Sequence, residues 1–362
     1  MTLDLKNLSE LTLVVPSYNR QEFILRLMNY WSGSGLKLIV MDGTIIKIDP
    51  SLLNKLLDNI QYIHCPTGIY DRLKISINFV NTKYVALAGD DEFYIPTALS
   101  KCIEELKENP ELVACCGRSL AFYVENTVIN GGVQYPELDN YIIEDNNAND
   151  RLLFHMKNYA QSLTYAVCLS ELWKKSLTCI TNKEYPFYAA FELQFEMLMS
   201  FAGKSKVIPE LMWLRSINEN IPTRGTDPSL FPEKIFSDWW INSEIKEKKL
   251  FVSSMALAFE KMNSGLNINY QDSVYEGCNA FRKFYEYHEK NNYKKLLKKI
   301  ILKLLPNNIL KIIRNYIKEK NRNKPSDSML QAAKKLENSG VFVDLKQLIK
   351  IESIIKKFHQ IN

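Results

Sequence analysis

Apolar runs alternate with amphipathic helical patterns through the first third of the chain, and this alternation is the strongest constraint on its fold. The pairs are Leu11–Val15 with Gln21–Trp31, Leu36–Met41 with Ser51–Leu57, Tyr62–Cys65 with Tyr70–Phe79, and Tyr84–Ala88 with Pro96–Leu106, followed by the run Leu112–Cys116. Strands that alternate with helices predict an α/β fold, with an open, mostly parallel sheet covered by helices on both faces.

The rest of the chain is less regular. Asn126–Asp150 is rich in Asn, Asp and Gly, which indicates a loop or a hairpin. Beyond Phe236 the patterns are helical, and Ser328–Asn362 is predicted to form two short helices. Because 362 residues exceed what one hydrophobic core usually supports, we expect two units. These are an α/β domain at 1–235 and a helical C-terminal region at 236–362.

Polar turns follow three of the expected strands. They are Pro16–Arg20, Asp42–Thr44 and Gly89–Glu92. Open α/β sheets bind ligands at the carboxyl ends of their strands. The three turns are therefore the first candidates for a ligand site.

The turn Gly89–Glu92 places three carboxylates in a row, Asp90, Asp91 and Glu92, directly after a buried strand. Adjacent acids repel each other, and a hard divalent cation such as Mg²⁺ or Mn²⁺ removes that repulsion while sharing its coordination with phosphates. The alternative is a helix N-terminus, where the helix dipole favours acids. That alternative explains one acid before Pro96 more easily than three.

The other two turns each allow two interpretations. Ser17 or Asn19 is suited to cap the following helix, or the turn is suited to hold a nucleotide. The carboxylate of Asp42 is suited to accept a hydrogen bond from a pyrimidine N–H, or to stabilise a turn before Gly43. The residues alone leave both pairs of alternatives open.

Together the three turns resemble the family-2 glycosyltransferases of the GT-A fold. The matching residues are Val14–Arg20, the strand-end Asp42, and the acidic Gly89–Glu92 with the downstream Pro96. The resemblance covers roughly residues 11–216 and leaves the C-terminal third outside. It implies that the α/β domain is catalytic and takes a nucleotide-diphosphate sugar as donor.

The resemblance also implies a role for individual residues. The base would lie near Pro16, Tyr18 and Asp42, Asp90 would face the sugar or ribose, and Mg²⁺ or Mn²⁺ would bind near Asp91 with Glu92 as a second ligand. The complete donor set is Pro16, Tyr18, Arg20, Asp42, Arg72, Asp90 and Arg215. For Arg72 the alternative is a solvated helix face.

Inverting members of the family use a carboxylate as general base near a helix start, about a dozen residues before a glycine. Glu192 stands in that place before Gly203, although Phe191 replaces the acid of the usual Glu-Asp pair. Glu192 is therefore the expected base, which would deprotonate the acceptor hydroxyl. Glu196 is a distant second candidate.

A fork of guanidinium donors suits a departing diphosphate, and Arg215 and Arg224 are the candidates for that role. The Gln-x-x-Arg-Trp motif of processive synthases is missing, which favours transfer of a single sugar. We expect a part in the assembly of surface polysaccharide or another glycan.

Residues 290–324 carry twelve Lys or Arg against one acid, Glu319. They form basic amphipathic patterns, which are suited to an anionic membrane surface or to packing on the catalytic domain. Membrane binding would imply a lipid-linked or membrane-presented glycan acceptor. Nucleic acid is not expected, because exposed aromatics do not interleave with the lysines.

The remaining features narrow the class of protein. Seven Cys with no C-x-x-C pair favour a reducing compartment, so we expect a cytoplasmic protein, or one peripheral on the inner face of the membrane. No phosphate-loop or Ser-hydrolase motif occurs. Two other functions stay open, a non-catalytic sugar- or nucleotide-binding module and, less favoured, a nucleotidyltransferase.

Overall fold

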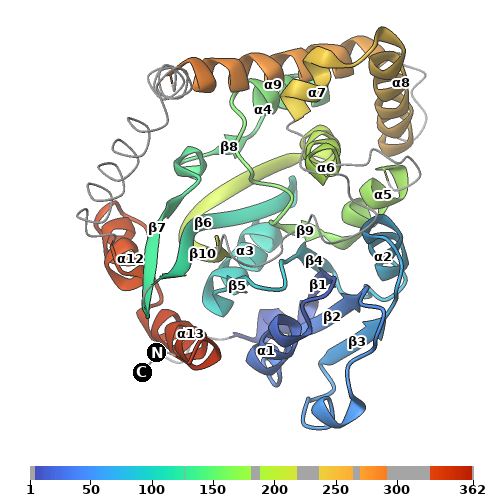
Figure 1. Cartoon of the computed structure of the whole chain (residues 1–362). Coiled ribbons are helices and arrows are strands. Elements are labelled where there is room, and N and C mark those ends of the chain that lie inside the picture. Colours follow the sequence, from blue (N-terminus) through green and yellow to red (C-terminus); the bar gives the residue numbers. More distant parts are fainter. Residues whose placement is uncertain are drawn as a thin grey trace, which may run out of the picture.

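The computed structural model describes residues 5–125, 127–180, 188–217, 236–263, 270–291 and 327–360. Figure 1 shows a curved sheet with helices on both sides, which confirms the predicted α/β class. The strand order is β3-β2-β1-β4-β9-β6-β10-β5, with β7 paired to β6 and β8 paired to β10.

The first half of the sheet is parallel, as the alternation predicts. Its strands are β1 (Leu11–Ser17), β2 (Lys37–Asp42), β3 (Ile60–His64) and β4 (Tyr84–Leu87). Its helices are α1 (Gln21–Trp31), α2 (Ile69–Ser76) and α3 (Pro96–Glu108). The helix expected over Ser51–Leu57 is wrong, since only the 3-10 turn η2 (Pro50–Leu52) forms. Leu52 and Leu57 are exposed there, so no packing stabilises a longer helix.

The second half of the sheet contains antiparallel pairs. Its strands are β5 (Phe93–Tyr94), β6 (Leu112–Glu125), β7 (Val128–Gln134), β8 (Ile142–Ile143), β9 (Val167–Leu169) and β10 (Lys204–Ser216). The strands β6 and β7 form a long antiparallel hairpin, and its second strand lies in the segment for which the sequence indicates a loop or a hairpin. Short 3-10 turns, η1 (Leu5–Glu10) and η3 (Pro136–Leu138), lie before β1 and after β7.

A layer of helices packs beyond this half of the sheet. Its members are α4 (Ala148–Lys157), α5 (Ser170–Ile180), α6 (Tyr188–Ala202), α7 (Phe236–Asn242), α8 (Ile245–Met262) and α9 (Gln271–Asn291). The helix α6 contacts α4, α5 and α8, so it lies at the centre of the layer. Its position explains why most of its side chains are buried.

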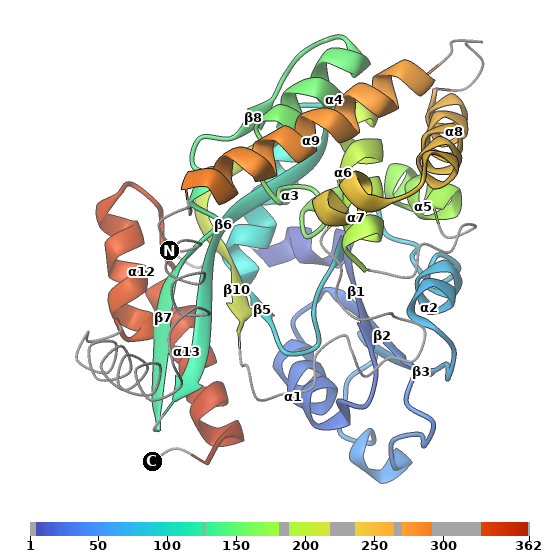
Figure 2. The ribbon, with the colours of Figure 1, turned by 45° about the horizontal axis from the view of Figure 1, so that its top comes forward.

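The two C-terminal helices, α12 (Met329–Asn338) and α13 (Leu345–Phe358), form as predicted and pack on the sheet domain (Figure 2). The backbone of α12 approaches β7 so closely at Gly131 that a Cβ there would lie 2.7 Å from Met329 Cα. Between the helices, Phe342 bonds to both Pro209 O and Leu211 N of β10. These backbone groups are available because β10 shifts its register on β6 at this point.

The buried apolar residues form one continuous cluster. It includes Val14 and Leu120 of the sheet together with Phe251, Leu336 and Ile351 of the later helices. The predicted division near residue 235 stays a prediction, because residues 218–235 lie outside the described part of the chain. Among the described residues, no helix has the length and apolar character needed to cross a membrane.

Candidate functional site

The three polar turns lie at one edge of the sheet. Ser17 and Asp42 are register partners at the ends of β1 and β2, and Gly43 N donates to Ser17 O at 2.8 Å. Ser17 Oγ donates to Asp90 Oδ2 at 2.7 Å, which joins the first turn to the acidic turn after β4. The parallel pairing of β1 with both neighbours therefore gathers the turns as the sequence predicts.

Arg20 lies between the two aspartates of the acidic turn. Its Nη1 is 3.1 Å from Asp90 Oδ1 and its Nη2 is 2.6 Å from Asp91 Oδ2. Burial raises the pKa of the Asp90 carboxyl to about 7, and the charge of Arg20 opposes that rise. The arginine thus compensates the two carboxylates, which is a role the sequence did not reveal.

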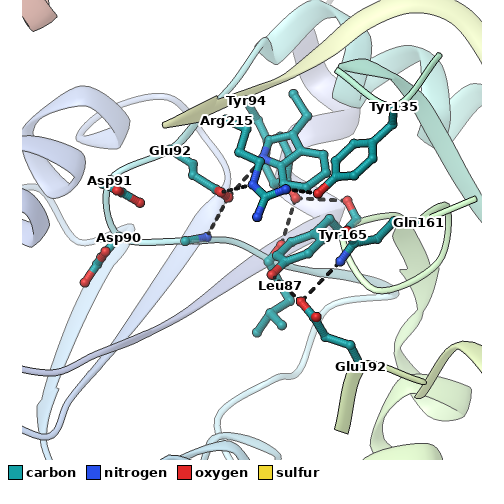
Figure 3. A network of polar contacts seen from close by, with 12 residues as sticks. Leu87, Asp90, Asp91, Glu92, Tyr94, Tyr135, Gln161, Tyr165, Glu192 and Arg215 are labelled. Carbon is teal, nitrogen blue, oxygen red and sulfur yellow. Dashed lines mark hydrogen bonds and ion pairs between the residues drawn. The ribbon is translucent and has the colours of Figure 1, made fainter. Parts of the chain in front are cut away.

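Glu92 points away from the two aspartates, as Figure 3 shows. Its Oε2 accepts a hydrogen bond from Trp213 Nε1 at 2.9 Å, and its Oε1 lies 3.9 Å from Arg215 Nε. The three consecutive acids are therefore not one cluster. Glu92 instead serves as the acceptor for the buried indole N–H of Trp213, which requires one.

Asp90 and Asp91 still fit a divalent cation. Mg²⁺ and Mn²⁺ are commonly held by one or two carboxylates while substrate phosphates and water complete the shell. In the described part of the chain, no group of three or more His, Cys, Asp or Glu side chains is placed to hold a metal ion.

Arg26 of α1 supports the acidic turn from below. Its Nη2 donates to Asp91 O at 2.9 Å, and its guanidinium lies 4.6–5.0 Å from the ring centres of Phe23, Phe93 and Phe358. Burial lowers the pKa of Arg26 to about 10. The C-terminal helix α13, which supplies Phe358, thus contributes to the position of a turn more than 200 residues earlier.

Asp42 is completely buried at the end of β2. Its carboxylate accepts from Thr44 N at 2.9 Å, from Tyr62 OH at 2.7 Å and from Gln21 Nε2 at 3.0 Å. The contact to Thr44 N is the one expected of a turn aspartate. These three donors already occupy the buried carboxylate, and recognition of a base by Asp42 stays a prediction.

Arg72 of α2 is buried, which contradicts the alternative of a solvated helix face. Its Nη1 donates to Thr67 O, and its guanidinium lies directly against Gly43, the residue after Asp42. Pro16 and Tyr18 are half-buried on the neighbouring turn after β1. The structure therefore places Pro16, Tyr18 and Arg72 at the same sheet edge, as expected of a donor site.

Gly43→Ala is predicted to disturb this edge. A Cβ at Gly43 would lie 2.0 Å from Arg72 Nη1, so the buried guanidinium would have to move. Overpacking of this kind costs about 1–3 kcal/mol of stability. Urea unfolding followed by circular dichroism measures that loss. Gly132→Ala is the matched control, because no atom lies within 4 Å of its added Cβ, and an equal effect of the two changes would contradict the prediction.

Glu192 lies in α6 and is half-buried. Its Oε1 accepts from Tyr165 OH at 3.0 Å and from Gln161 Nε2 at 3.1 Å, so two neutral donors fix the carboxylate (Figure 3). Glu196, one turn later, is completely buried. It accepts from Thr164 N at 2.7 Å and pairs with His155 Nε2 at 2.9 Å, so it has no access to an acceptor and acts structurally.

An aromatic stack runs between Arg215 and Glu192. Trp213 lies between Tyr135 and Tyr165, with ring centres 5.6 and 4.5 Å away, and the rings are within 25° of parallel. Tyr135 OH accepts from Arg215 Nη1, and Tyr165 OH reaches Glu192. Tyr135 has a φ of 50°, a strained conformation of the kind that concentrates at functional sites. Nothing in the sequence marked Tyr135 and Tyr165 as site residues, because the two tyrosines come from separate segments of the chain.

Comparisons with known proteins agree with this geometry. The family model described as "Glycosyl transferase family 2" matches residues 12–154. A search of curated protein sequences finds no significant match. The match to the family model spans the Pro16–Arg20 turn, Asp42 and the acidic turn.

Among solved structures, the chain is similar to S. aureus TarS 1-349, which is 12% identical at a TM-score of 0.42 and is matched over 78% of this chain and 91% of that chain. Its complex with UDP gives the same values, and its complex with UDP-GlcNAc is 11% identical at a TM-score of 0.43, over 78% of this chain and 92% of that chain. A likeness of this size transfers no ligand and no reaction. The family match over residues 12–154, on an α/β fold with its motifs at one sheet edge, supports a glycosyltransferase similar to family 2.

Proposed function

We propose that this enzyme transfers a single sugar from a nucleotide-diphosphate sugar to an acceptor hydroxyl, with inversion at the anomeric carbon. The observation that carries the proposal is the meeting of the Pro16–Arg20 turn with Asp90 and Asp91 at one sheet edge, joined by the bond from Ser17 to Asp90. Glu192 lies across the aromatic stack from this edge. A donor site and a base are thus available on two sides of one site.

The nucleotide is proposed to lie along the turns after β1 and β2. Pro16 and Tyr18 are half-buried there and offer a surface for the base, while Arg72 supports the Asp42–Gly43 turn from beneath. Asp91, with Asp90, would hold Mg²⁺ or Mn²⁺. When bound, this cation would neutralise charge on the donor diphosphate. Glu92 is not part of the proposed metal site, because its carboxylate is directed to Trp213.

In the proposed reaction the acceptor oxygen attacks the anomeric carbon on the face opposite the diphosphate. As that bond forms, the bond from the anomeric carbon to the phosphate oxygen breaks, and its electron pair leaves with the diphosphate. Glu192 takes the proton of the acceptor hydroxyl. Gln161 and Tyr165 hold the Glu192 carboxylate in one orientation, so no reorientation is needed at the moment of transfer.

Arg215 is proposed to stabilise the departing diphosphate. Its side chain is about a quarter exposed, and its guanidinium lies beside Tyr135 and Glu92, at the same end of the aromatic stack as the acidic turn. Guanidinium donors suit phosphate oxygens in geometry and charge. Arg224, the other candidate, lies outside the described residues.

The acceptor is proposed to be a glycan or a lipid-linked glycan in surface polysaccharide assembly, on the cytoplasmic side of the membrane. This part rests on the sequence of residues 290–324, whose lysine-rich amphipathic patterns suit an anionic lipid surface. Residues 292–324 lie outside the described part of the chain.

Calorimetry with nucleotides tests the donor site. UDP, GDP, CDP and CMP are titrated with and without Mn²⁺ into the wild type and into Asp91→Asn. We expect metal-dependent binding of one nucleoside diphosphate. Loss of an outer-shell partner of a metal costs about 10–100-fold in affinity, and loss of the ligand Asp91 should cost at least as much.

Asp58→Asn is the control for this experiment. Asp58 is exposed and precedes β3, so it lies at the opposite edge of the sheet. It should bind nucleotide like the wild type. If no nucleotide binds under any condition, the donor-site assignment fails and a non-catalytic module becomes the better explanation.

A further inference from the structure

We propose that Arg20 acts as an exchangeable internal cation. In the donor-free enzyme its guanidinium occupies the position between Asp90 and Asp91, and the metal-bound donor displaces it toward the diphosphate. This inference rests on the proposed metal role of the two aspartates. The motif already places Arg20 among the donor residues, and the proposal adds that this side chain exchanges with the metal.

The contacts of Arg20 show that its guanidinium fills the position between Asp90 and Asp91. Arg20 touches one oxygen of each aspartate, at 3.1 and 2.6 Å, and the three side chains are only 7–14% exposed. Charge-assisted contacts at such distances are among the stronger polar interactions, particularly where water is largely excluded. The face that the two carboxylates share is therefore filled by the guanidinium.

Charge balance shows that the guanidinium and a divalent cation compete. When both are ionised, the two carboxylates carry two negative charges, which one divalent cation neutralises completely. If Arg20 stayed in contact with both aspartates, the buried group would gain a net positive charge and two cations would lie a few ångströms apart. Before the diphosphate charge is added, repulsion at that separation is large near a protein interior, and it favours the departure of the guanidinium from the aspartates.

Only the side chain of Arg20 has to move. Its backbone is the N-cap of α1, and the preceding Asn19 is fixed by a hydrogen bond from its N–H to Thr44 Oγ1 at 2.9 Å. The guanidinium packs over the Phe23 ring at 4.6 Å and can slide along that face. The released charge thus remains beside the metal, where the donor diphosphate would bring two or more negative charges.

Arg26 makes a different contribution. It donates to the backbone oxygen of Asp91 and is enclosed by three aromatic rings, so its guanidinium is fixed. The acidic turn is therefore held by one immobile arginine through its backbone and neutralised by a second arginine through its side chains. Exchange at Arg20 leaves the backbone of the turn in place.

The test measures Mn²⁺ alone and nucleotide separately. Free Mn²⁺ is followed by electron paramagnetic resonance during titration of the wild type, Arg20→Gln, Arg20→Lys and Asp91→Asn. If Arg20 fills the site in at least nine of ten molecules, its removal strengthens Mn²⁺ binding about tenfold or more. Arg20→Gln should bind Mn²⁺ more tightly, and should bind the nucleoside diphosphate, at saturating Mn²⁺, more weakly. Arg20→Lys should lie between.

Thermal unfolding distinguishes a change in Mn²⁺ affinity from a variant that merely folds poorly. Arg20→Gln leaves two carboxylates uncompensated, so Mn²⁺ should raise its Tm by more than it raises that of the wild type. Equal Mn²⁺ affinity in the wild type and Arg20→Gln would overturn the exchange while keeping the metal site. Absence of Mn²⁺ binding in both, or binding that Asp91→Asn leaves unchanged, would overturn the metal role itself and the exchange with it.

Discussion

Replacing Glu192 with Gln is expected to lower the rate of sugar transfer by about 10²–10⁴-fold, which is the usual contribution of a general base. The carboxamide keeps the shape of the side chain, and its oxygen can still accept from Tyr165 OH and Gln161 Nε2. It cannot take up the proton of the acceptor hydroxyl. The change should therefore lower kcat, with nucleotide affinity and Tm close to the wild type.

This prediction is measured as product formation at saturating donor, once calorimetry has named the nucleotide. Glu171→Gln, an exposed acid in the first turn of α5, is the control and should keep full activity. A rate for Glu192→Gln within a few-fold of the wild type would remove Glu192 from the base role.

Glu196→Ala is expected to destabilise the enzyme by about 3–5 kcal/mol, as for a buried pair that loses one partner. The substitution leaves His155 without its carboxylate and removes the shared acceptor of Leu163 N and Thr164 N. The hydrogen bond between His155 Nδ1 and Tyr141 OH belongs to the same buried network and should weaken with it.

Urea unfolding followed by tryptophan fluorescence gives the loss. Glu192→Ala is the comparison on the same helix. Because Glu192 is half-buried and bonded to two neutral side chains, its removal should cost far less stability. A small loss for Glu196→Ala, below about 1 kcal/mol, would show that the buried network contributes little. We therefore expect two acids one helical turn apart to differ in effect, with Glu192 governing the rate of transfer and Glu196 the stability of the fold.

The parts of the site that come from single strand-to-turn units were predictable from the sequence. Each such unit is local, and parallel pairing then brings the ends of β1, β2 and β4 to one edge without further information. The helix that carries Glu192 also followed, since α6 forms where the helical pattern indicates, whereas the choice of Glu192 came from the family resemblance. These features depend on periodicity and on sheet geometry alone.

The direction of the Glu92 side chain in the acidic motif could not be predicted from the sequence. Three neighbouring carboxylates suggested one cluster, but the chain becomes extended at β5 directly after Glu92 and turns this side chain to the other side. Its partner Trp213 is over a hundred residues away. The one available signal was Trp213 itself, because an indole N–H in an apolar strand needs an acceptor when it is buried.

The contacts of Arg20, Arg26 and Tyr135 were also beyond the sequence. Each joins segments far apart in the chain, and one sequence gives no measure of such proximity. Arg26 could have been noticed as a charge on the apolar face of α1, where Phe23 and Leu27 are buried. Its partner Phe358 has no comparable signal.

The support of Arg26 by Phe358 has a consequence for how the enzyme is made. Synthesis proceeds at about 5–20 residues per second, so α13 leaves the ribosome tens of seconds after the acidic turn. During that interval the Asp90–Asp91 turn lacks one of the three rings that enclose its arginine support. A nascent chain with all three strand-end turns in place therefore has an unfinished candidate donor site, and that site is completed only when α13 docks.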